Sequence, residues 1–229
     1  MNRWTLLIPL AGLVLAAGCR KDDHGHVDLG HAYFPTGIGH WVEYVVDSAW
    51  IDEANQITGH RTYHLRELLE SELIDDEGRT AQRVERYVLD SLGEWAIRDI
   101  WTQTRNSTSA ERTEENRRYL KLSFPPHEGE YWNLNVYNAE DPLEVEYQMV
   151  DQPWSANGLN FDSTLVVRST FLNNLVDTLI YIERYAKHVG MVDRQVDSSN
   201  TQFIFNDTLP PAPRTRGWYL RQTITAFGP

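Results

Sequence analysis

Apolar and polar side chains alternate over much of residues 33–229, and this period of two constrains the fold more than any other feature. The alternation is clearest in residues 120–124, 132–136 and 144–149. A period of two puts successive side chains on opposite faces of a strand. These segments therefore predict strands with one face on the core and one in water, and in residues 120–124 Lys121 falls on the wet face.

Turn-forming residues separate the predicted strands. The Asp-Asp-Glu-Gly sequence at 75–78 predicts a hairpin that joins strands at 62–73 and 79–89. Leucines within 62–73 would also suit one face of a helix, which is the alternative for that segment. Further turns are expected at 55–59, 106–109, 125–126, 157–158 and 210–211.

The predicted elements indicate an all-β fold. Counting them gives about nine to eleven strands and no alternating helices, which excludes a doubly wound α/β fold. We expect a single antiparallel domain over residues 33–229, built as a half-barrel, a sandwich or a barrel.

Composition limits the classes of function. The chain has 229 residues and a formal net charge of −12, with 21 Lys and Arg against 33 Asp and Glu. Nucleic-acid binding depends on clustered cations, so no nucleic-acid partner is expected, and electrostatic docking on anionic lipid is disfavoured. The single cysteine excludes an intramolecular disulfide and a Cys-rich zinc site.

The first residues are typical of an export signal. Arg3 precedes an apolar stretch at 6–15, which is too short to cross a bilayer, and small residues follow up to Cys19. Residues 15–19, Leu-Ala-Ala-Gly-Cys, resemble a bacterial lipobox, with Ala16 three residues before the cysteine. The resemblance implies that residues 1–18 are a cleaved signal peptide and that Cys19 carries lipid, which would anchor the protein to a membrane. The alternative is an ordinary signal peptide with an incidental cysteine.

The residues after the cysteine carry a second signal. Lys21, Asp22 and Asp23 resemble the surface-export signal of Bacteroidetes lipoproteins, within a polar stretch at 19–32 that we expect to be a flexible tether. The alternative is a charged tether with no export role. Further segments resemble an uncharacterised family of Bacteroidetes outer-membrane lipoproteins: 33–35, 39–44, 77–79, 122–125, 132–133 and 185–192. The resemblance implies a surface-exposed location on the outer membrane, and the family brings no established activity or catalytic residues.

No sequence motif indicates catalysis or a cofactor. The chain has no Gly-x-Ser-x-Gly elbow, no phosphate-binding Gly-x-x-x-x-Gly-Lys and no His-Glu-x-x-His. We propose no catalytic residue, no cofactor and no metal site from the sequence. Histidines near the start could ligate a metal, but a solvated linker is the better interpretation; they are His24, His26, His31 and His40. His60 and His64 are expected on one strand face, roughly 13 Å apart, on the surface.

Tryptophans and Asp-Ser or Asp-Thr pairs are the remaining candidates for sites. Most tryptophans should fill the core, whereas Trp50 at a strand end and Trp154 in a predicted loop at 153–157 are candidates for ligand contact. Five hydroxyl residues resemble the O-glycosylation sites of exported Bacteroidetes proteins, although such pairs also form turns. They are Ser48, Ser91, Ser163, Thr178 and Thr208.

These observations favour a lipid-anchored cell-envelope protein with a non-catalytic binding or accessory role in the outer membrane. Its partners would be the membrane, through the lipid on Cys19, and an outer-membrane protein complex or a small ligand. The alternatives are a half-barrel that carries a lipid or another apolar ligand, and an envelope hydrolase without a recognisable motif. A partner-binding protein should expose an aromatic patch, a carrier should enclose an apolar cavity, and an enzyme should gather polar groups in a cleft.

Overall fold

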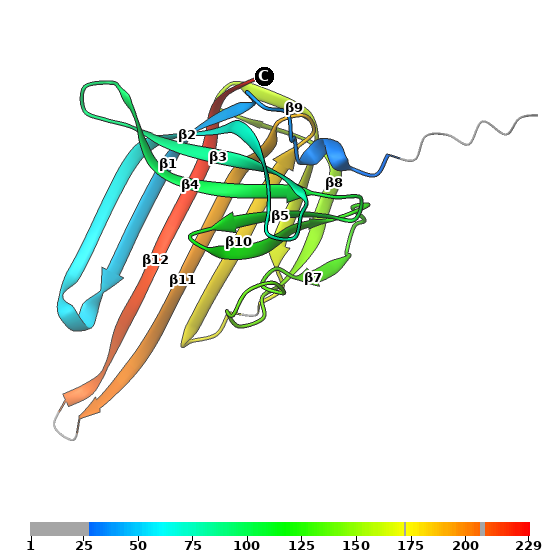
Figure 1. Cartoon of the computed structure of the whole chain (residues 1–229). Coiled ribbons are helices and arrows are strands. Elements are labelled where there is room, and N and C mark those ends of the chain that lie inside the picture. Colours follow the sequence, from blue (N-terminus) through cyan, green and yellow to red (C-terminus); the bar gives the residue numbers. More distant parts are fainter. Residues whose placement is uncertain (1–27, 172, 207–208) are drawn as a thin grey trace, which may run out of the picture.

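The computed structural model describes residues 28–171, 173–206 and 209–229, in which twelve strands form one antiparallel sheet (Figure 1). The strands are β1 (Trp41–Asp52), β2 (Ile57–Ile74), β3 (Thr80–Leu89), β4 (Trp95–Arg105), β5 (Ser109–Glu114), β6 (Arg117–Ser123), β7 (Tyr131–Asn133), β8 (Glu144–Ala156), β9 (Leu159–Ser169), β10 (Asp177–Ala186), β11 (Gly190–Asn206) and β12 (Leu209–Gly228). Two short 3-10 helices are η1 (His31–Tyr33) and η2 (Glu53–Asn55). The order across the sheet is β6-β5-β4-β3-β2-β1-β12-β11-β10-β9-β8-β7.

The prediction of an all-β, antiparallel fold is confirmed, with one strand more than the upper end of the expected range. The hairpin predicted around 75–78 joins β2 and β3, so the helical alternative for 62–73 is wrong. The turn expected at 210–211 is also wrong, because β12 begins at Leu209. β1 pairs with β12 only as far as Arg216, so these prolines have a neighbouring strand on one side only, where proline is tolerated.

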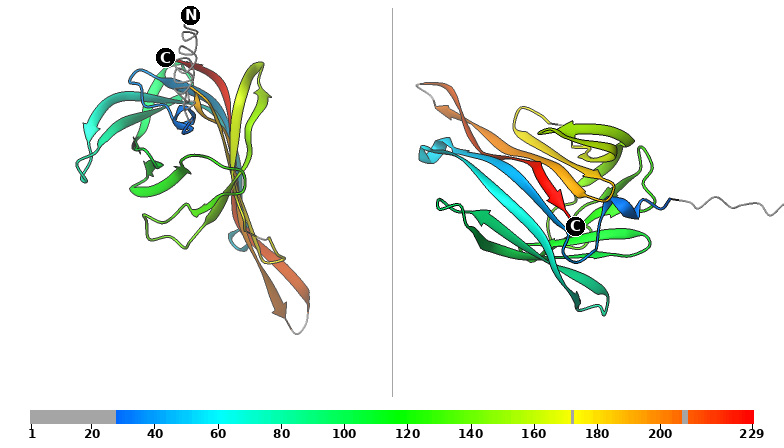
Figure 2. Two further views of the ribbon diagram at one scale, coloured as in Figure 1. Left: turned by 90° about the vertical axis from the view of Figure 1, so that its right-hand side faces the viewer. Right: turned by 90° about the horizontal axis from the view of Figure 1, so that it is seen from above.

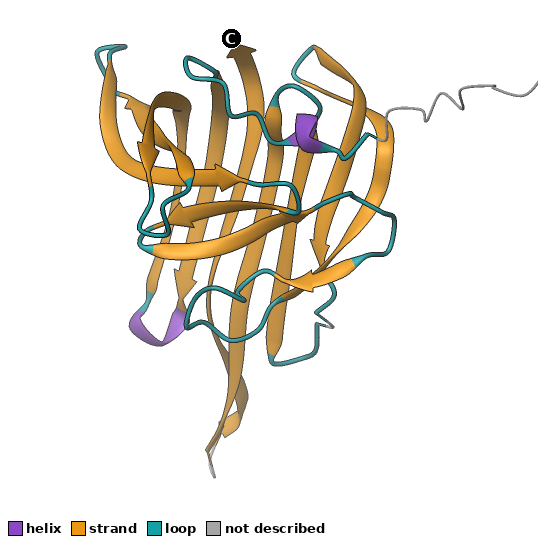
Figure 3. Cartoon of the chain, turned by 45° about the vertical axis from the view of Figure 1, so that its right-hand side comes forward, coloured by secondary structure: helices purple, strands orange, loops and turns teal. Residues whose placement is uncertain are grey.

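The sheet curls until β4–β6 face β10–β12 across the core (Figures 2 and 3). Apolar side chains from its concave face fill the interior, and the largest fully buried ones include Tyr44, Leu65, Tyr147 and Tyr185. We call the end near residue 28 and the C-terminus the upper end, and the end where β11 and β12 project beyond the other strands the lower end (Figure 1).

The two edges of the sheet, β6 and β7, meet without a strand ladder. The Leu120 amide donates to the Leu134 carbonyl (2.9 Å), and the Trp132 indole donates to the Leu120 carbonyl (2.8 Å). The Tyr147 hydroxyl accepts from the Ser123 amide (2.9 Å) and donates to the Ser123 carbonyl (2.6 Å). These bonds nearly close the barrel and occupy backbone groups that an edge strand would otherwise expose.

Residues 28–40 close the upper end. Tyr33 and Phe34 are buried in the core, and the Arg105 guanidinium donates to the backbone carbonyls of His31 and Phe34 (2.7 and 2.8 Å). Residues 28–32, assigned to the tether from sequence, lie against the barrel, where Asp28 pairs with Lys187 (2.9 Å). The chain therefore enters the fold as a plug in the upper end.

A β-bulge in β6 places Lys121 inside the barrel, so the predicted position on the wet face is wrong. Ala110 pairs with Leu122 and Glu111 pairs with Leu120, which leaves Lys121 without a partner on β5. The extra residue of a bulge locally breaks the alternation of faces. Lys121 therefore enters the barrel, where it is 2% exposed, instead of facing water.

Candidate binding cleft

Two hollows adjoin on the concave face towards the lower end, and both are lined by Leu179, Ser198 and Trp218. The inner hollow, of about 190 Å³, reaches Lys121 and Tyr181. The outer hollow, of about 410 Å³, extends along β10–β12 beneath the loop that follows β9. We call the two together the Trp218 cleft. The outer hollow alone has the size of a small-molecule site.

An ionic cluster forms the floor of the inner hollow. The Lys121 ammonium contacts Glu114 (2.7 Å), Glu183 (2.9 Å) and the Tyr181 hydroxyl (3.1 Å). Arg194 bonds Glu114 (3.1 Å) and lies 3.4 Å from Glu183. Two cations and two carboxylates thus connect β5 and β6 to β10 and β11 across the core, with their charges balanced.

The surroundings favour the charged forms of Glu114, Glu183 and Arg194. Burial opposes the ionisation of Glu114 and Glu183, but Lys121 and Arg194 outweigh it and hold both carboxyl pKa values below their usual range. Burial likewise opposes the charge on Arg194, yet the two carboxylates raise its pKa. Burial, followed by the charge of Glu183, raises the pKa of Tyr181. Each of these shifts moves away from neutral pH, so the four groups act as fixed charges or hydrogen-bond donors and acceptors rather than as acids or bases.

One exposed indole, that of Trp218, lines both hollows of the cleft. Trp218 is 46% exposed and stands directly opposite Trp50, which is 43% exposed, across β1 and β12. Trp50, which the sequence indicated as a candidate for ligand contact, is exposed near the end of β1. The exposure of Trp218 was not predicted, because most tryptophans were expected to fill the core.

The other predicted aromatic lies elsewhere. Trp154 is on β8 rather than in a loop, half-buried and stacked on Phe161 (ring centroids 6.0 Å apart). Phe161 contacts Phe227, which pairs with Val42 at the upper end of β1. Val42 and Trp50 are eight residues apart on β1, or about 26 Å, so the structure does not bring Trp154 and Trp50 together.

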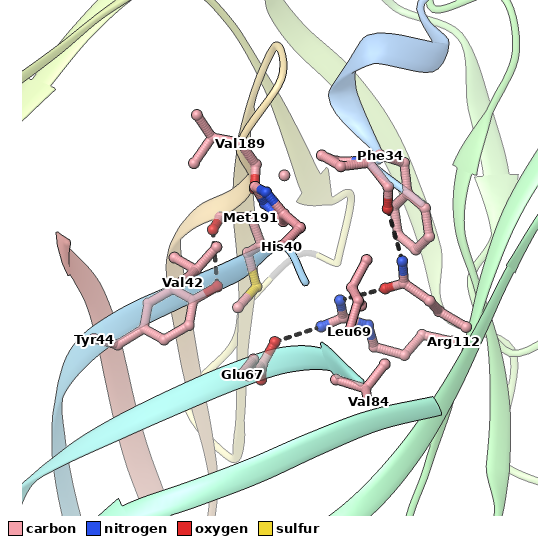
Figure 4. A pocket seen from close by; sticks show the side chains of 13 residues that line it. Phe34, His40, Val42, Tyr44, Glu67, Leu69, Val84, Arg112, Val189 and Met191 are labelled. Carbon is pink, nitrogen blue, oxygen red and sulfur yellow. Dashed lines mark hydrogen bonds and ion pairs between the residues drawn. The ribbon is translucent and has the colours of Figure 1, made fainter. Parts of the chain in front are cut away.

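A second, smaller space lies beneath the plug at the upper end (Figure 4). Its volume of about 30 Å³ fits water and no organic ligand. Arg112 bonds Glu67 there (2.9 Å), and the Tyr44 hydroxyl donates to the Met191 carbonyl (2.9 Å). This space is part of the packed interior.

The predicted modification sites differ in their surroundings. Cys19, Lys21, Asp22 and Asp23 lie outside the residues that the structure describes, as does Thr208. Ser91 is exposed in the turn between β3 and β4, whereas Ser48 and Thr178 are half-buried within β1 and β10. The Ser163 hydroxyl bonds Tyr33 (2.8 Å) and Asp151 (2.7 Å).

Among the histidines of the sequence analysis, His31 and His40 have separate partners, and His24 and His26 lie outside the residues that the structure describes. His31 contacts the Ser107 carbonyl (3.2 Å), and His40 contacts the Val189 carbonyl (2.9 Å). His60 and His64 are both exposed on β2, as predicted. Among residues 28–171, 173–206 and 209–229, no three His, Cys, Asp or Glu side chains are grouped to hold a metal ion. None of the helices in this part of the chain is long and apolar enough to span a membrane.

No family model, curated protein or solved structure matches the chain.

Proposed function

We propose that this chain is a lipid-anchored protein of the bacterial cell envelope whose β domain binds a ligand in the Trp218 cleft without transforming it. The anchor rests on the sequence alone: the lipobox-like residues 15–19 end at Cys19. Lys21, Asp22 and Asp23 favour display on the outer-membrane surface. The binding role rests on one observation, the exposed Trp218 indole on the wall that the two hollows share.

The chemistry of the cleft favours binding over hydrolysis. General acid–base catalysis needs a group whose pKa lies near the working pH. Glu114 and Glu183 are ionised and paired, and the pKa of Tyr181 is raised, so none of these groups is poised to exchange a proton. They can instead hold a polar part of a ligand in place.

The interior disfavours the alternative of an apolar carrier. A carrier needs an enclosed apolar cavity, whereas core side chains and the ionic cluster fill the described barrel. The Trp218 cleft is open and lined by both polar and apolar groups. Its ligand should therefore combine apolar and polar surfaces.

Native mass spectrometry of the full-length protein, gently extracted from its own membrane, tests the binding role. We expect a bound small mass in the wild type and its loss in Trp218→Ala. Phe203→Ala is the matched control, because Phe203 is 45% exposed on β11, on the convex side of the same strand pair. A stoichiometric extra protein that survives Trp218→Ala would instead make the chain a subunit of an envelope complex, and no bound mass would contradict the proposal.

Detergent phase partitioning tests the anchor separately. Two or more acyl chains should carry the wild type into the detergent phase, and Cys19→Ser should move it into the aqueous phase. Equal partitioning of the two proteins would show that Cys19 carries no lipid.

A further inference from the structure

Five residues from adjacent strands form a row across the concave face. Trp50 pairs with Gly59 on β2 and with Trp218 on β12; Trp218 pairs with Ser198 on β11, which pairs with Leu179 on β10. We call these residues the aromatic row. Strands lie about 4.8 Å apart, so the row runs for about 19 Å at right angles to the strands.

Gly59 makes room for the Trp50 indole. A Cβ at Gly59 would lie 2.1 Å from Cζ2 and 2.3 Å from Cε2 of Trp50, too close for any other residue to fit without moving the ring. The Trp50 indole therefore lies over β2 and remains 43% exposed. The Trp218 indole is on the paired residue of β12, so both rings are presented on the same face of the sheet.

Polar side chains run parallel to this row, two residues nearer the lower end. They are Asp52, Arg216, Asn200 and Asp177, which pair in that order across β1, β12, β11 and β10. The Asn200 amide donates to Asp177 (2.7 Å), and Arg216, with its side chain 84% exposed, lies 3.7 Å from Asp52. We call these residues the polar row. Its groups offer both donors and acceptors beside the indoles.

We propose that the aromatic row binds a neutral oligosaccharide, with its rings on Trp50 and Trp218 and its hydroxyl groups on the polar row. The inference rests on the proposed function and names its ligand class. A pyranose ring has C–H groups on its faces, which pack on an aromatic ring, and hydroxyl groups around its edge, which need planar polar partners. The concave face of the sheet supplies both surfaces in adjacent rows.

The strand geometry argues against a peptide as the ligand. A peptide that binds a sheet by strand addition needs unpaired backbone groups at an edge. The aromatic row crosses β1, β12 and β11, each of which is paired on both sides at this level. A single-stranded nucleic acid would need a cationic groove, whereas the polar row contains two aspartates and one arginine.

Titration of intrinsic tryptophan fluorescence in the full-length, detergent-solubilised protein tests the proposal. The probes are neutral hexasaccharides: maltohexaose, cellohexaose, xylohexaose, mannohexaose and chitohexaose. We expect at least one to bind, and Trp218→Ala to weaken it about tenfold, because stacking on one aromatic ring contributes roughly this factor. The Phe203→Ala control should change affinity by less than about twofold.

Gly59→Ala tests whether the position of the Trp50 indole matters for binding, and not only the presence of the two tryptophans. The added methyl should displace the Trp50 indole and weaken the same hexasaccharide several-fold while both tryptophans remain. Circular dichroism of each variant should match the wild type. Binding that is unchanged in both Trp218→Ala and Gly59→Ala would overturn the proposal.

The two proposals can fail separately. If no hexasaccharide binds, but native mass spectrometry shows a small mass that Trp218→Ala removes, the cleft binds a ligand that is not a neutral oligosaccharide. If neither measurement shows binding, both the ligand class and the binding role are wrong.

Discussion

At the residue scale, Lys121 neutralises buried carboxylates in the interior of the barrel. The Lys121 side chain is 2% exposed, and its ammonium contacts both Glu114 and Glu183. Lys121→Met would leave two buried carboxylates with Arg194 as their remaining cation in this cluster. Removing one partner of a buried ion pair typically costs about 3–5 kcal/mol, so we expect a loss of this size in the free energy of unfolding, measured by urea denaturation.

A second cation on the same strand is the control for Lys121. Arg117 pairs with Glu140 (3.0 Å), but their side chains are 57% and 46% exposed. Water already solvates such a pair, so Arg117→Met should cost less than about 1 kcal/mol. Equal losses in the two variants would show that burial of the Lys121 cluster does not determine its effect.

Asp151 provides a pH-dependent contribution at the upper end. Hydrogen bonds from Lys187, Ser163 and Tyr33 lower its pKa to about 2 from 3.8. Because the folded pKa lies below the unfolded one, ionised Asp151 stabilises the fold above about pH 4, and this contribution is lost as the pH falls through about 2. Asp151→Asn should therefore be less stable than the wild type near neutral pH, and the difference should close between about pH 4 and 2.

Thermal unfolding of both proteins across this pH range measures the effect. Asp162→Asn, at an exposed position on β9, controls for the loss of one negative charge. A stability difference between wild type and Asp151→Asn that stays constant from neutral pH to pH 2 would contradict the assignment.

At the scale of elements, the Tyr147 side chain replaces a missing strand partner for β6. Its hydroxyl accepts from the Ser123 amide and donates to the Ser123 carbonyl. Tyr147→Phe would leave both backbone groups without this partner, at a cost of about 1–3 kcal/mol. We expect lower stability in urea and faster hydrogen exchange at the Ser123 amide.

Tyr63→Phe is the comparison for that prediction. The Tyr63 hydroxyl accepts from the exposed Arg98 side chain (2.8 Å), which water can solvate instead. Its loss should cost less than about 1 kcal/mol and leave exchange at Ser123 unchanged. Unchanged exchange at Ser123 in Tyr147→Phe would show that the closure of β6 does not depend on this hydroxyl.

The strands themselves could be predicted, because alternation and turn residues are local signals. The β2–β3 hairpin follows from the Asp-Asp-Glu-Gly turn, in which Asp75 accepts from the backbone amides of Glu77 and Arg79. Bulges could not be predicted, because a bulge depends on the register of a neighbouring strand. Another bulge, between β3 and β4, separates Ile97 from Trp101, which strict alternation would place on one face: Ile97 is exposed and Trp101 is buried.

The candidate site could be predicted only in part for the same reason. Trp50 was identified as an exposed aromatic, but the alternation of Trp218 with Leu220 gives no sign that β12 continues beyond the strands that cover the core. Lys121 and Glu183 are 62 residues apart, and their contact depends on how the sheet curls. A local sequence pattern can predict the face of a strand on which a side chain lies. It cannot predict which residue of a distant strand that side chain will contact.

At the scale of the whole molecule, the first described residues and the Trp218 cleft lie at opposite ends of the barrel. Residue 28 lies at the upper end. The outer hollow of the Trp218 cleft is lined by residues of β10–β12 nearer the lower end, where β11 and β12 project beyond the other strands (Figure 1). A lipid on Cys19 would therefore hold the upper end, and the lower end would be free to reach ligand. If the protein is displayed on the cell surface, this lower end should be accessible from outside intact cells.

The single cysteine allows a direct measurement of that orientation. With the lipid thioether proposed for Cys19, the wild type would have no free thiol, and Gln202→Cys, at an exposed position on β11, would introduce the only thiol that can react. We expect a membrane-impermeant maleimide to label this variant equally before and after the outer membrane is permeabilised, and to leave the wild type unlabelled. Pro229→Cys, at the exposed C-terminus of the upper end, tests whether the end nearer the anchor is equally accessible. Labelling of Gln202→Cys only after permeabilisation would place the domain on the periplasmic side, where the same cleft would meet a different set of ligands.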